Sequence, residues 1–318
     1  MEFKRDNLRI MTGNANPALA RKIADFLGVN LIDVIVGHFN NGEIQVVIEE
    51  SIRGKDIYII QPTSQPVNDN LMELLIMVDA CRRASANSVT AIVPYYAYAR
   101  QDRKTRGREP ISAKLVANLI ETAGCDRVIT VDLHAGQIQG FFDIPVDHIA
   151  AAPVIAKYLR EQNYEDIVVV SPDLGGVTRA RILADYLRAP IAIIEKRRPK
   201  PGVAEVMNLI GDVEGKTAII IDDMVDSAGS LIEGTKALVD LKVKRVLACC
   251  SHAILSGPAK DRIESSPLEK LVITDTIALP EDKKIDKIVV LSMAEPIAEV
   301  IECIQSHESV SRLFEKRG

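Results

Sequence analysis

Short runs of apolar residues, separated by stretches of helical periodicity, set the strongest limit on how this chain can fold. The runs are bounded by turn residues and predict strands. Between them, patterns such as 71–84 and 231–241 predict helices. Strands that alternate with helices are typical of an α/β fold whose mainly parallel sheets are covered on both faces. The predicted strands are Leu8–Met11, Ile57–Ile60, Val89–Val93, Val128–Val131, Ile167–Val170, Ile191–Ile194, Ala218–Ile221, Val246–Cys250, Leu271–Ile273 and Ile288–Leu291.

The two halves of the chain resemble each other at a constant offset. Ala24–Leu27 precedes the similar Ala184–Leu187 by 160 positions, and Asp126–Val128 precedes Asp286–Ile288 by the same distance. Each match is short, but several in one order favour a duplicated α/β domain with its join near residue 150. Ligands of open parallel sheets bind beyond the carboxyl ends of the strands, so functional residues are expected directly after the predicted strands.

Composition narrows the functional classes. A chain of 318 residues is long enough for two domains, and 47% hydrophobic with 26% charged residues argues against disorder. A net charge of −5 gives no sign of a nucleic-acid partner. The five cysteines lack CxxC spacing and are expected to be buried in a reducing compartment. No apolar run reaches membrane-spanning length and the N-terminus lacks a signal-peptide pattern, so a cytoplasmic location without membrane association is expected.

The segment Asp222–Ser230 carries the strongest functional signal. It follows three isoleucines, begins with two adjacent acids and leads into a helix predicted from Leu231. Small residues let backbone amides approach a phosphate, and a helix N-terminus favours an anion. The acids can accept hydrogen bonds from vicinal sugar hydroxyls, so the segment favours a sugar phosphate lying across the loop. The alternative, an aspartate or serine that only caps a helix, stays open.

Two other predicted strands lead into candidate ligands. His134 stands beside an Ala-Gly turn and is a candidate metal or phosphate ligand, although a lone histidine is more often structural. Asp173 precedes a Gly-Gly turn and can ligate magnesium, which prefers one or two carboxylates together with substrate oxygens. An aspartate that caps the following helix explains the same pattern.

Three further loops carry groups suited to a nucleotide. Ile194–Gly202 places four cations beside two prolines and a glycine, which favours a cationic lid for phosphoryl-type transfer. Pro94–Lys104 interleaves tyrosines with cations, so that a ring can stack on a base while arginine meets phosphates. Tyr95 and Tyr96 are nevertheless expected in the core. Phe39–Glu43 is the corresponding loop of the first half, and the chain has neither a Walker A pattern nor GxGxxG.

Together these motifs resemble the ribose-phosphate pyrophosphokinase (phosphoribosyl pyrophosphate synthetase) family, in its phosphate-dependent class I. The match spans nearly the whole chain, and the complete set in order is specific, whereas the last loop alone indicates only the wider phosphoribosyltransferase fold. The motifs are Asn41–Glu43, Glu49–Gly54, Tyr98–Lys104, Val131–Phe142, Ser171–Asp173, Lys196 with Arg198, and Asp222–Ser230.

The resemblance implies an enzyme that transfers the β,γ-diphosphate of MgATP to the anomeric hydroxyl of ribose 5-phosphate. The products would be 5-phosphoribosyl 1-pyrophosphate and AMP, for nucleotide biosynthesis. His134 and Asp173 would hold Mg²⁺, and Lys196 and Arg198 would stabilise the transition state. ATP would be bound by Phe39, Asn41, Glu43, Arg100 and Gln101. Ribose 5-phosphate would be bound by Asp222, Asp223, Asp226, Ser227, Ala228, Gly229 and Ser230.

The resemblance also implies an architecture and partners. It predicts two tandem phosphoribosyltransferase-like domains, each a mainly parallel sheet flanked by helices, at 1–150 for ATP and 151–318 for ribose 5-phosphate. A homohexamer is expected, with some ATP-binding residues crossing a subunit boundary. Phosphate is expected to activate the enzyme and ADP to inhibit it. The implied regulatory site comprises Ser51, Arg53, Arg108, Ser309, Ser311 and Phe314.

The chain departs from the family pattern at Asn40, where serine or alanine is common, and in two other places. Ser227 and Ser230 stand where threonine is common, and both keep the hydroxyl. The stretch Ser256–Glu269 departs more freely, which leaves its local structure open. Two rival interpretations are a phosphoribosyltransferase, which has no use for the Phe39 and Arg100 motifs, and a non-catalytic homologue that assembles with active subunits. The second is disfavoured because His134, Lys196 and Asp222 are present.

Overall fold

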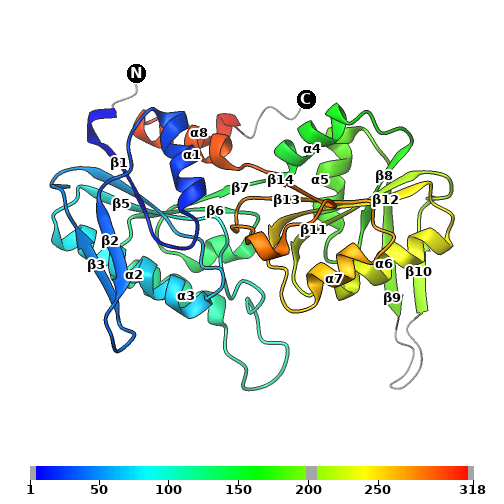
Figure 1. Ribbon diagram of the computed structural model, residues 1–318, viewed down its shortest axis with the longest axis horizontal. Helices are drawn as coiled ribbons and strands as arrows, with labels where there is room; N and C mark the ends of the chain where they lie inside the picture. Colours follow the sequence, from blue (N-terminus) through cyan, green and yellow to red (C-terminus); the bar gives the residue numbers. More distant parts are fainter. Residues whose placement is uncertain (1–4, 198–205, 314–318) are drawn as a thin grey trace. The chain divides into compact units, whose positions relative to one another are not determined.

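The computed structural model describes residues 5–197 and 206–313, which pack as two compact units (Figure 1). Unit 1 comprises the described residues up to Ala150 together with 276–278 and those from Ser292 onward. Unit 2 comprises 151–275 and 279–291. Both are α/β units with a mainly parallel sheet between helices, which confirms the predicted fold class.

Unit 1 contains a parallel sheet in the order β1-β4-β5-β6-β7 and a separate antiparallel hairpin, β2-β3. The strands are β1 (Leu8–Thr12), β2 (Val34–His38), β3 (Ile44–Ile48), β4 (Asp56–Ile60), β5 (Ser88–Val93), β6 (Arg127–Val131) and β7 (Val146–Ile149). In Figure 1, α2 and α3 cover one face of the sheet, and α1 and α8 cover the other. The helices are α1 (Pro17–Leu27), α2 (Val67–Arg83), α3 (Ser112–Ala123) and α8 (Ala294–Gln305), with short turns η1 (Arg5–Asn7), η2 (Gly136–Phe141) and η4 (Val310–Leu313).

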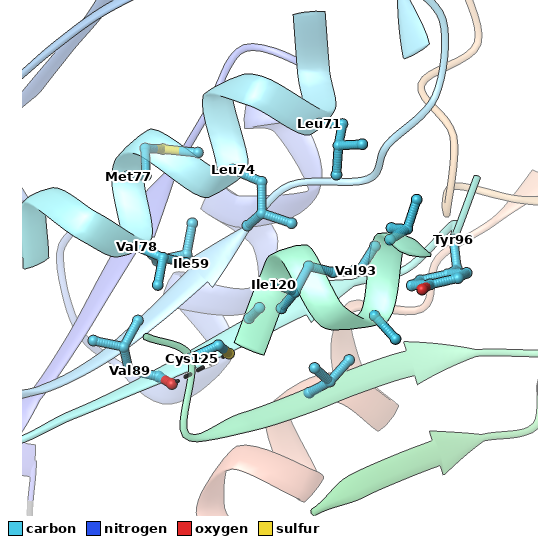
Figure 2. Close-up of a cluster of buried hydrophobic side chains, with 14 of the residues drawn as sticks. Ile59, Leu71, Leu74, Met77, Val78, Val89, Val93, Tyr96, Ile120 and Cys125 are labelled. Carbon is cyan, nitrogen blue, oxygen red and sulfur yellow. Dashed lines mark hydrogen bonds between the residues drawn. The ribbon is translucent and has the colours of Figure 1, made fainter. Parts of the chain in front are cut away.

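The central strands of unit 1, β4, β5 and β6, are buried at all but their first positions because helices cover both faces of the sheet. Successive side chains alternate between the faces, and one set packs against α2 and α3. Figure 2 shows Leu74 and Ile120 of these helices beside Ile59 and Val93 of the strands. In the same cluster Cys125 Sγ lies 3.5 Å from the carbonyl oxygen of Val89. All five cysteines are free and buried, as predicted.

Unit 2 contains one sheet in the order β10-β9-β8-β11-β12-β13-β14. β10 pairs antiparallel with β9, and the other neighbours are parallel. The strands are β8 (Ile167–Ser171), β9 (Ile191–Arg197), β10 (Val206–Ile210), β11 (Thr217–Val225), β12 (Arg245–Ala253), β13 (Lys270–Thr274) and β14 (Ile288–Leu291). The helices are α4 (Ala152–Glu161), α5 (Val177–Leu187), α6 (Gly229–Asp240) and α7 (Ala259–Glu264), with a short turn η3 (Glu281–Lys283). α4 packs on α5, and α6 packs on α7.

The topology supports the duplication but corrects its alignment. The first helices of the repeats, α1 and α5, begin 160 residues apart, and β4 and β11 begin 161 apart. The match of Asp126–Val128 with Asp286–Ile288 is wrong, because it pairs β6, second from the edge of its sheet, with the edge strand β14. By sheet order β6 corresponds to β13, which begins 143 residues later. The second repeat is therefore shorter between β11 and β13 than the first is between β4 and β6.

Each repeat ends in a helix that lies in the other unit. α4 follows β7 along the chain but belongs to unit 2, whereas α8 follows β14 but belongs to unit 1 and packs on α1. Gln305 Nε2 on α8 donates to the Tyr58 hydroxyl at 3.3 Å. This arrangement differs from a continuous second domain at 151–318. The allocation of ATP to the first domain and of ribose 5-phosphate to the second stays a prediction.

All ten predicted strands are present, and β2, β3, β7 and β10 are additional. No helix in the described part of the chain combines the length and the hydropathy that crossing a bilayer requires.

Candidate functional site

In unit 2 the strand order reverses between β8 and β11. β8 leads through α5 to β9 on one side, whereas β11 leads through α6 to β12 on the other. In open parallel sheets such a reversal leaves a crevice at the carboxyl ends of the strands, where ligands bind. Asp173 follows β8, and Asp222 and Asp223 lie near the end of β11. The structure therefore brings these predicted residues to one edge of the sheet.

The two acids lie inside β11 and not after it as predicted. β11 runs to Val225, whereas the predicted strand ended at Ile221. Its pairing with β8 stops at Ile220, but its pairing with β12 continues to Val225. The acids therefore lie just beyond the part of β11 that pairs on both sides.

Arg179 of α5 is a functional candidate that the sequence interpretation missed. Its Nη1 lies 3.3 Å from Asp222 Oδ1 and 3.5 Å from Asp223 Oδ1. Asp222 Oδ1 also accepts the backbone N–H of Asp223 at 2.8 Å. Burial, followed by the adjacent Asp223, raises the pKa of Asp222 to about 7, and the Arg179 guanidinium limits the rise. The Asp222 carboxyl is therefore expected to titrate near neutral pH.

We expect Asp222→Asn to become more stable relative to the parent protein as the pH rises. Because the pKa of Asp222 is raised on folding, ionisation of the parent costs folding free energy as the pH climbs from about 4 towards 7. Asparagine cannot ionise, so the difference in Tm should grow over this range and then level off. Thermal unfolding between pH 4 and pH 9 measures the difference.

A matched control is Asp212→Asn, because hydrogen bonding to Lys216 lowers the pKa of that exposed aspartate. Its difference in Tm should be small and of the opposite sign. A difference for Asp222→Asn that stays flat across the range would contradict the raised pKa.

The loop between β11 and α6 is held by hydrogen bonds from a later segment of the chain. Ala228 has a left-handed backbone with φ of 59°, and α6 begins at Gly229, two residues earlier than predicted. Asp226 Oδ1 accepts a short hydrogen bond from the Ser256 hydroxyl, and Arg262 Nη1 donates to the Ser227 carbonyl oxygen at 2.9 Å. Both partners come from the segment whose structure the sequence left open, and this segment contains α7. They fix the loop while the Ser227 and Ser230 side chains stay exposed.

Asp173 is exposed and holds the turn into α5, because its Oδ1 accepts the Gly176 N–H at 2.8 Å. This bond lies in the turn before α5, whose N-cap is Gly176 without a side-chain cap, so Asp173 is not the N-cap residue of the alternative interpretation. The metal role stays a prediction. β9 extends to Arg197, and parallel pairing of Ser171 with Ile193 places Lys196 beyond the last residue of β8 at the same edge. The predicted residue Arg198 lies outside the described residues.

In unit 1 the loops after β5 and β6 contact each other. Gln137 Nε2 donates to Asp102 Oδ2 at 2.9 Å, which joins the Arg100–Gln101 loop to the loop that carries His134. His134 itself is exposed. His148 Nε2 accepts the Leu133 N–H at 2.9 Å and thereby supports the backbone beside His134.

The structure also tests the prediction that Tyr95 and Tyr96 lie in the core. Tyr95 and Tyr96 are buried, and the Tyr96 hydroxyl donates to the Ala113 carbonyl at 2.8 Å, which confirms their place in the core. Gln101 is held by the hydroxyl of Ser112, which donates to Gln101 Oε1 at 2.5 Å. The backbone at Gln101 is therefore fixed, while Arg100 stays at the surface.

The remaining predicted residues of unit 1 lie on its surface. Phe39, Asn41 and Glu43 form the exposed tip of the β2–β3 hairpin, where Phe39 is 50% exposed. The predicted regulatory residues within the described range are also exposed, and Phe314 lies outside that range. These exposed residues are Ser51, Arg53, Arg108, Ser309 and Ser311. The Ser311 N–H donates to the Ser309 hydroxyl at 3.3 Å, and no other contact within the described ranges joins members of this set.

A mainly parallel α/β unit with acids and a small-residue loop at the point of strand reversal, as in unit 2, defines a phosphoribosyltransferase-like fold, and the parallel sheet of unit 1 repeats the strand order from β8 to β14 without these acids. A profile of the N-terminal domain of ribose phosphate pyrophosphokinase matches residues 8–124, and a phosphoribosyl synthetase-associated domain matches 196–315. The chain belongs to the ribose-phosphate pyrophosphokinase family.

Individual relatives agree with this assignment over nearly their full length. The ribose-phosphate pyrophosphokinase of Bacillus caldolyticus is 60% identical over 97% of this chain and 98% of its own, and that of Bacillus subtilis is 59% identical over 98% and 99%. The crystal structure of phosphoribosylpyrophosphate synthetase from Mycobacterium smegmatis superposes with a TM-score of 0.90 at 43% identity, covering 95% of this chain and all of that one.

Proposed function

We propose that this protein is a ribose-phosphate diphosphokinase that makes 5-phosphoribosyl 1-pyrophosphate and AMP from ribose 5-phosphate and MgATP. The observation that carries the proposal is the near-full-length identity of 60% to a ribose-phosphate pyrophosphokinase, together with the acid pair and small-residue loop at the strand reversal of unit 2. In the reaction the anomeric oxygen bonds to the β-phosphorus of ATP. The bond from that phosphorus to the oxygen bridging to the α-phosphorus breaks, and AMP leaves with the electron pair.

The acceptor sugar would lie at the edge formed by β8 and β11. Asp222 and Asp223 would accept hydrogen bonds from the ribose hydroxyls, and Arg179 would hold both carboxylates in place. The 5-phosphate would bind backbone N–H groups of residues 226–230 at the start of α6, with the Ser227 and Ser230 hydroxyls as further donors. The support from Ser256 and Arg262 means that the loop is ordered before the ligand arrives, which lowers the entropic cost of binding.

ATP would be bound by the hairpin tip at Phe39, Asn41 and Glu43 and by the Arg100–Gln101 loop. Because these residues lie on exposed loops, we propose that an oligomer, in our expectation a homohexamer, completes the site across a subunit boundary. Lys196 and Arg198 would stabilise charge on the transferred group.

We propose Mg²⁺ as the metal, held by His134 and Asp173 directly or through water. Within residues 5–197 and 206–313 no three His, Cys, Asp or Glu side chains form a metal cluster. This fits magnesium, which is commonly held by one or two carboxylates together with substrate phosphates. When bound, the ion would neutralise charge on the phosphates of ATP.

Regulation and location complete the proposal. Phosphate would activate and ADP would inhibit through Ser51, Arg53, Arg108, Ser309, Ser311 and Phe314. A cytoplasmic location is supported by the five free cysteines, which suit a reducing compartment.

The test is product identity. With ribose 5-phosphate and MgATP, the protein should release one AMP for each phosphoribosyl pyrophosphate, and ATP labelled at the γ-phosphorus should pass its label to the sugar. Omitting ribose 5-phosphate should abolish AMP release. Stoichiometric ADP would contradict diphosphate transfer and would indicate an ordinary phosphotransferase.

A further inference from the structure

A buried polar network lies at the carboxyl edge of the unit 1 sheet, beside β1 and β4, which correspond by sheet order to β8 and β11 of unit 2. Its centre is Glu73 of α2, which is 2% exposed. Glu73 Oε2 accepts the Asn14 backbone N–H at 3.0 Å and Gln61 Nε2 at 2.8 Å. Glu73 Oε1 accepts Asn14 Nδ2 at 2.7 Å. The network thus joins the residues that follow β1 and β4 to α2.

Asn14 extends this network to the β2–β3 hairpin. Its Nδ2 donates a second hydrogen bond, to the Val36 carbonyl oxygen, at 3.2 Å. Both neighbours of this nitrogen are acceptors, so the orientation of the amide is fixed by chemistry. Glu73, Asn14 and Val36 therefore form a chain from the helix to strand β2.

The Val36 carbonyl is at the outer edge of the hairpin. The Phe39 N–H donates to the Glu43 carbonyl at 2.8 Å, so the odd-numbered residues of β2 direct their backbone groups towards β3. The carbonyl of Val36 points the other way and finds its partner in Asn14. β2 and β3 form a sheet of two strands, which is only marginally stable without support from elsewhere.

We propose that Asn14 and Glu73 are positioning residues that hold the β2–β3 hairpin, and with it the ATP-binding tip at Phe39, Asn41 and Glu43. The functional part rests on the role proposed for that tip. Phe39 is three residues beyond Val36, and the Gly42 N–H closes the tip onto the Phe39 carbonyl at 2.8 Å, so an anchor at Val36 acts on the tip through a short, hydrogen-bonded segment.

The electrostatics of Glu73 agree with a positioning role. Among the described residues its hydrogen-bond donors are neutral amides, and no ion pair to it is found. A buried carboxylate without a cation is costly, and a buried amide or apolar group would be more stable. Two of its three acceptor contacts do, however, set the position of Asn14, which is itself exposed.

The first experiment removes the anchor with Asn14→Ala. Hydrogen exchange of the amides in residues 34–48 should become faster, whereas exchange in the central strands β4 and β5 should not change. The KM for ATP should rise roughly fivefold, which is the effect of one net hydrogen bond, while the KM for ribose 5-phosphate stays within twofold. Unchanged exchange in the hairpin would overturn the proposal, as would equal rises in both KM values.

The second experiment separates positioning from folding. Glu73→Gln alone places an amide nitrogen against Asn14 Nδ2 and should destabilise unit 1. The double variant Asn14→Asp with Glu73→Gln restores a donor and acceptor between the two side chains, so stability should recover. It still lacks a donor for the Val36 carbonyl, so the raised KM for ATP and the faster hairpin exchange should persist. Recovery of both readouts together with stability would overturn the proposal.

Asn70→Ala is the matched control. Asn70 is buried in the same network and its Nδ2 donates to the Ser64 carbonyl at 2.8 Å, without a bond to the hairpin. Asn70→Ala should lower the Tm but leave the KM for ATP unchanged, and a selective rise in that KM would overturn the proposal.

Phe39→Ala tests the proposed function of the tip separately. If Phe39→Ala leaves the KM for ATP unchanged, the proposed ATP-binding role of the tip is contradicted. Hydrogen exchange of the hairpin in Asn14→Ala still tests whether Asn14 anchors the hairpin.

Discussion

Lys196→Ala is expected to lower kcat by about two to three orders of magnitude, the usual loss when one group that stabilises transition-state charge is removed. Lys196 stands at the carboxyl end of β9, the strand next to β8, and so on the edge that carries Asp173 and the acid pair. Diphosphate transfer spreads negative charge over the transferred group, and a cation there acts mainly in the transition state. The loss should therefore appear in kcat, with the KM for ribose 5-phosphate little changed.

Lys216→Ala is the matched control for this prediction. Lys216 precedes β11 on the opposite edge of the same sheet and pairs with the exposed Asp212 at 2.8 Å. Removing it should leave kcat within about twofold, because exposed ion pairs contribute little. Both variants should retain the assembly state and the Tm of the parent. Near-normal turnover by Lys196→Ala would contradict its role at the reaction centre.

Arg179→Ala is expected to cost about 2–4 kcal/mol of stability and to weaken binding of ribose 5-phosphate. Asp223 is only 3% exposed, and removing the guanidinium takes away a cation that offsets its buried charge. Arg179 also holds down the raised pKa of Asp222, so its removal should raise that pKa further. Fewer ionised acceptors would then be present at pH 7, and the pH at which the sugar binds half-maximally should move upward.

Denaturant unfolding and the pH dependence of the KM for ribose 5-phosphate measure these two effects. Arg83→Ala is a suitable control, because Arg83 forms an exposed pair with Asp79 within α2 and its removal should change the stability little. Adding Asp223→Asn to Arg179→Ala should recover part of the stability, since the buried charge is then gone. A stability loss no greater than that of the control would show that the acids do not need Arg179.

The strands that the sequence missed share a physical reason. β2, β3 and β10 belong to antiparallel hairpins, and β7 is an edge strand with Asp147 and His148 at its centre. Their apolar runs are broken by polar residues, because one side of each is not enclosed between helices. The strands that were predicted are mostly those enclosed on both faces, where nearly every residue must be apolar.

The repeat was misread for a related reason. The offset of 160 holds where α1 and α5 follow the first strands, because no residues have been gained or lost there. Beyond that region the second repeat is shorter, and a three-residue match of the Asp-Arg-Val kind is too short to show the change. Sheet order decides which strands correspond, and pairing between strands is not visible in local periodicity.

The sequence by itself determined the α/β class, the ten apolar strands, the acids near the end of β11 and the family, because each depends on residues that are near neighbours along the chain or on motifs kept in order. Only the tertiary structure decided what these motifs contact. Arg179 reaches Asp222 across 43 positions, Ser256 reaches Asp226 across 30, and Asn14 reaches Glu73 across 59. The exchange of α4 and α8 between the units was equally hidden. Such contacts depend on which elements become neighbours when the sheet forms. The residues next to a single arginine, serine or asparagine in the sequence do not indicate which distant residue it will contact.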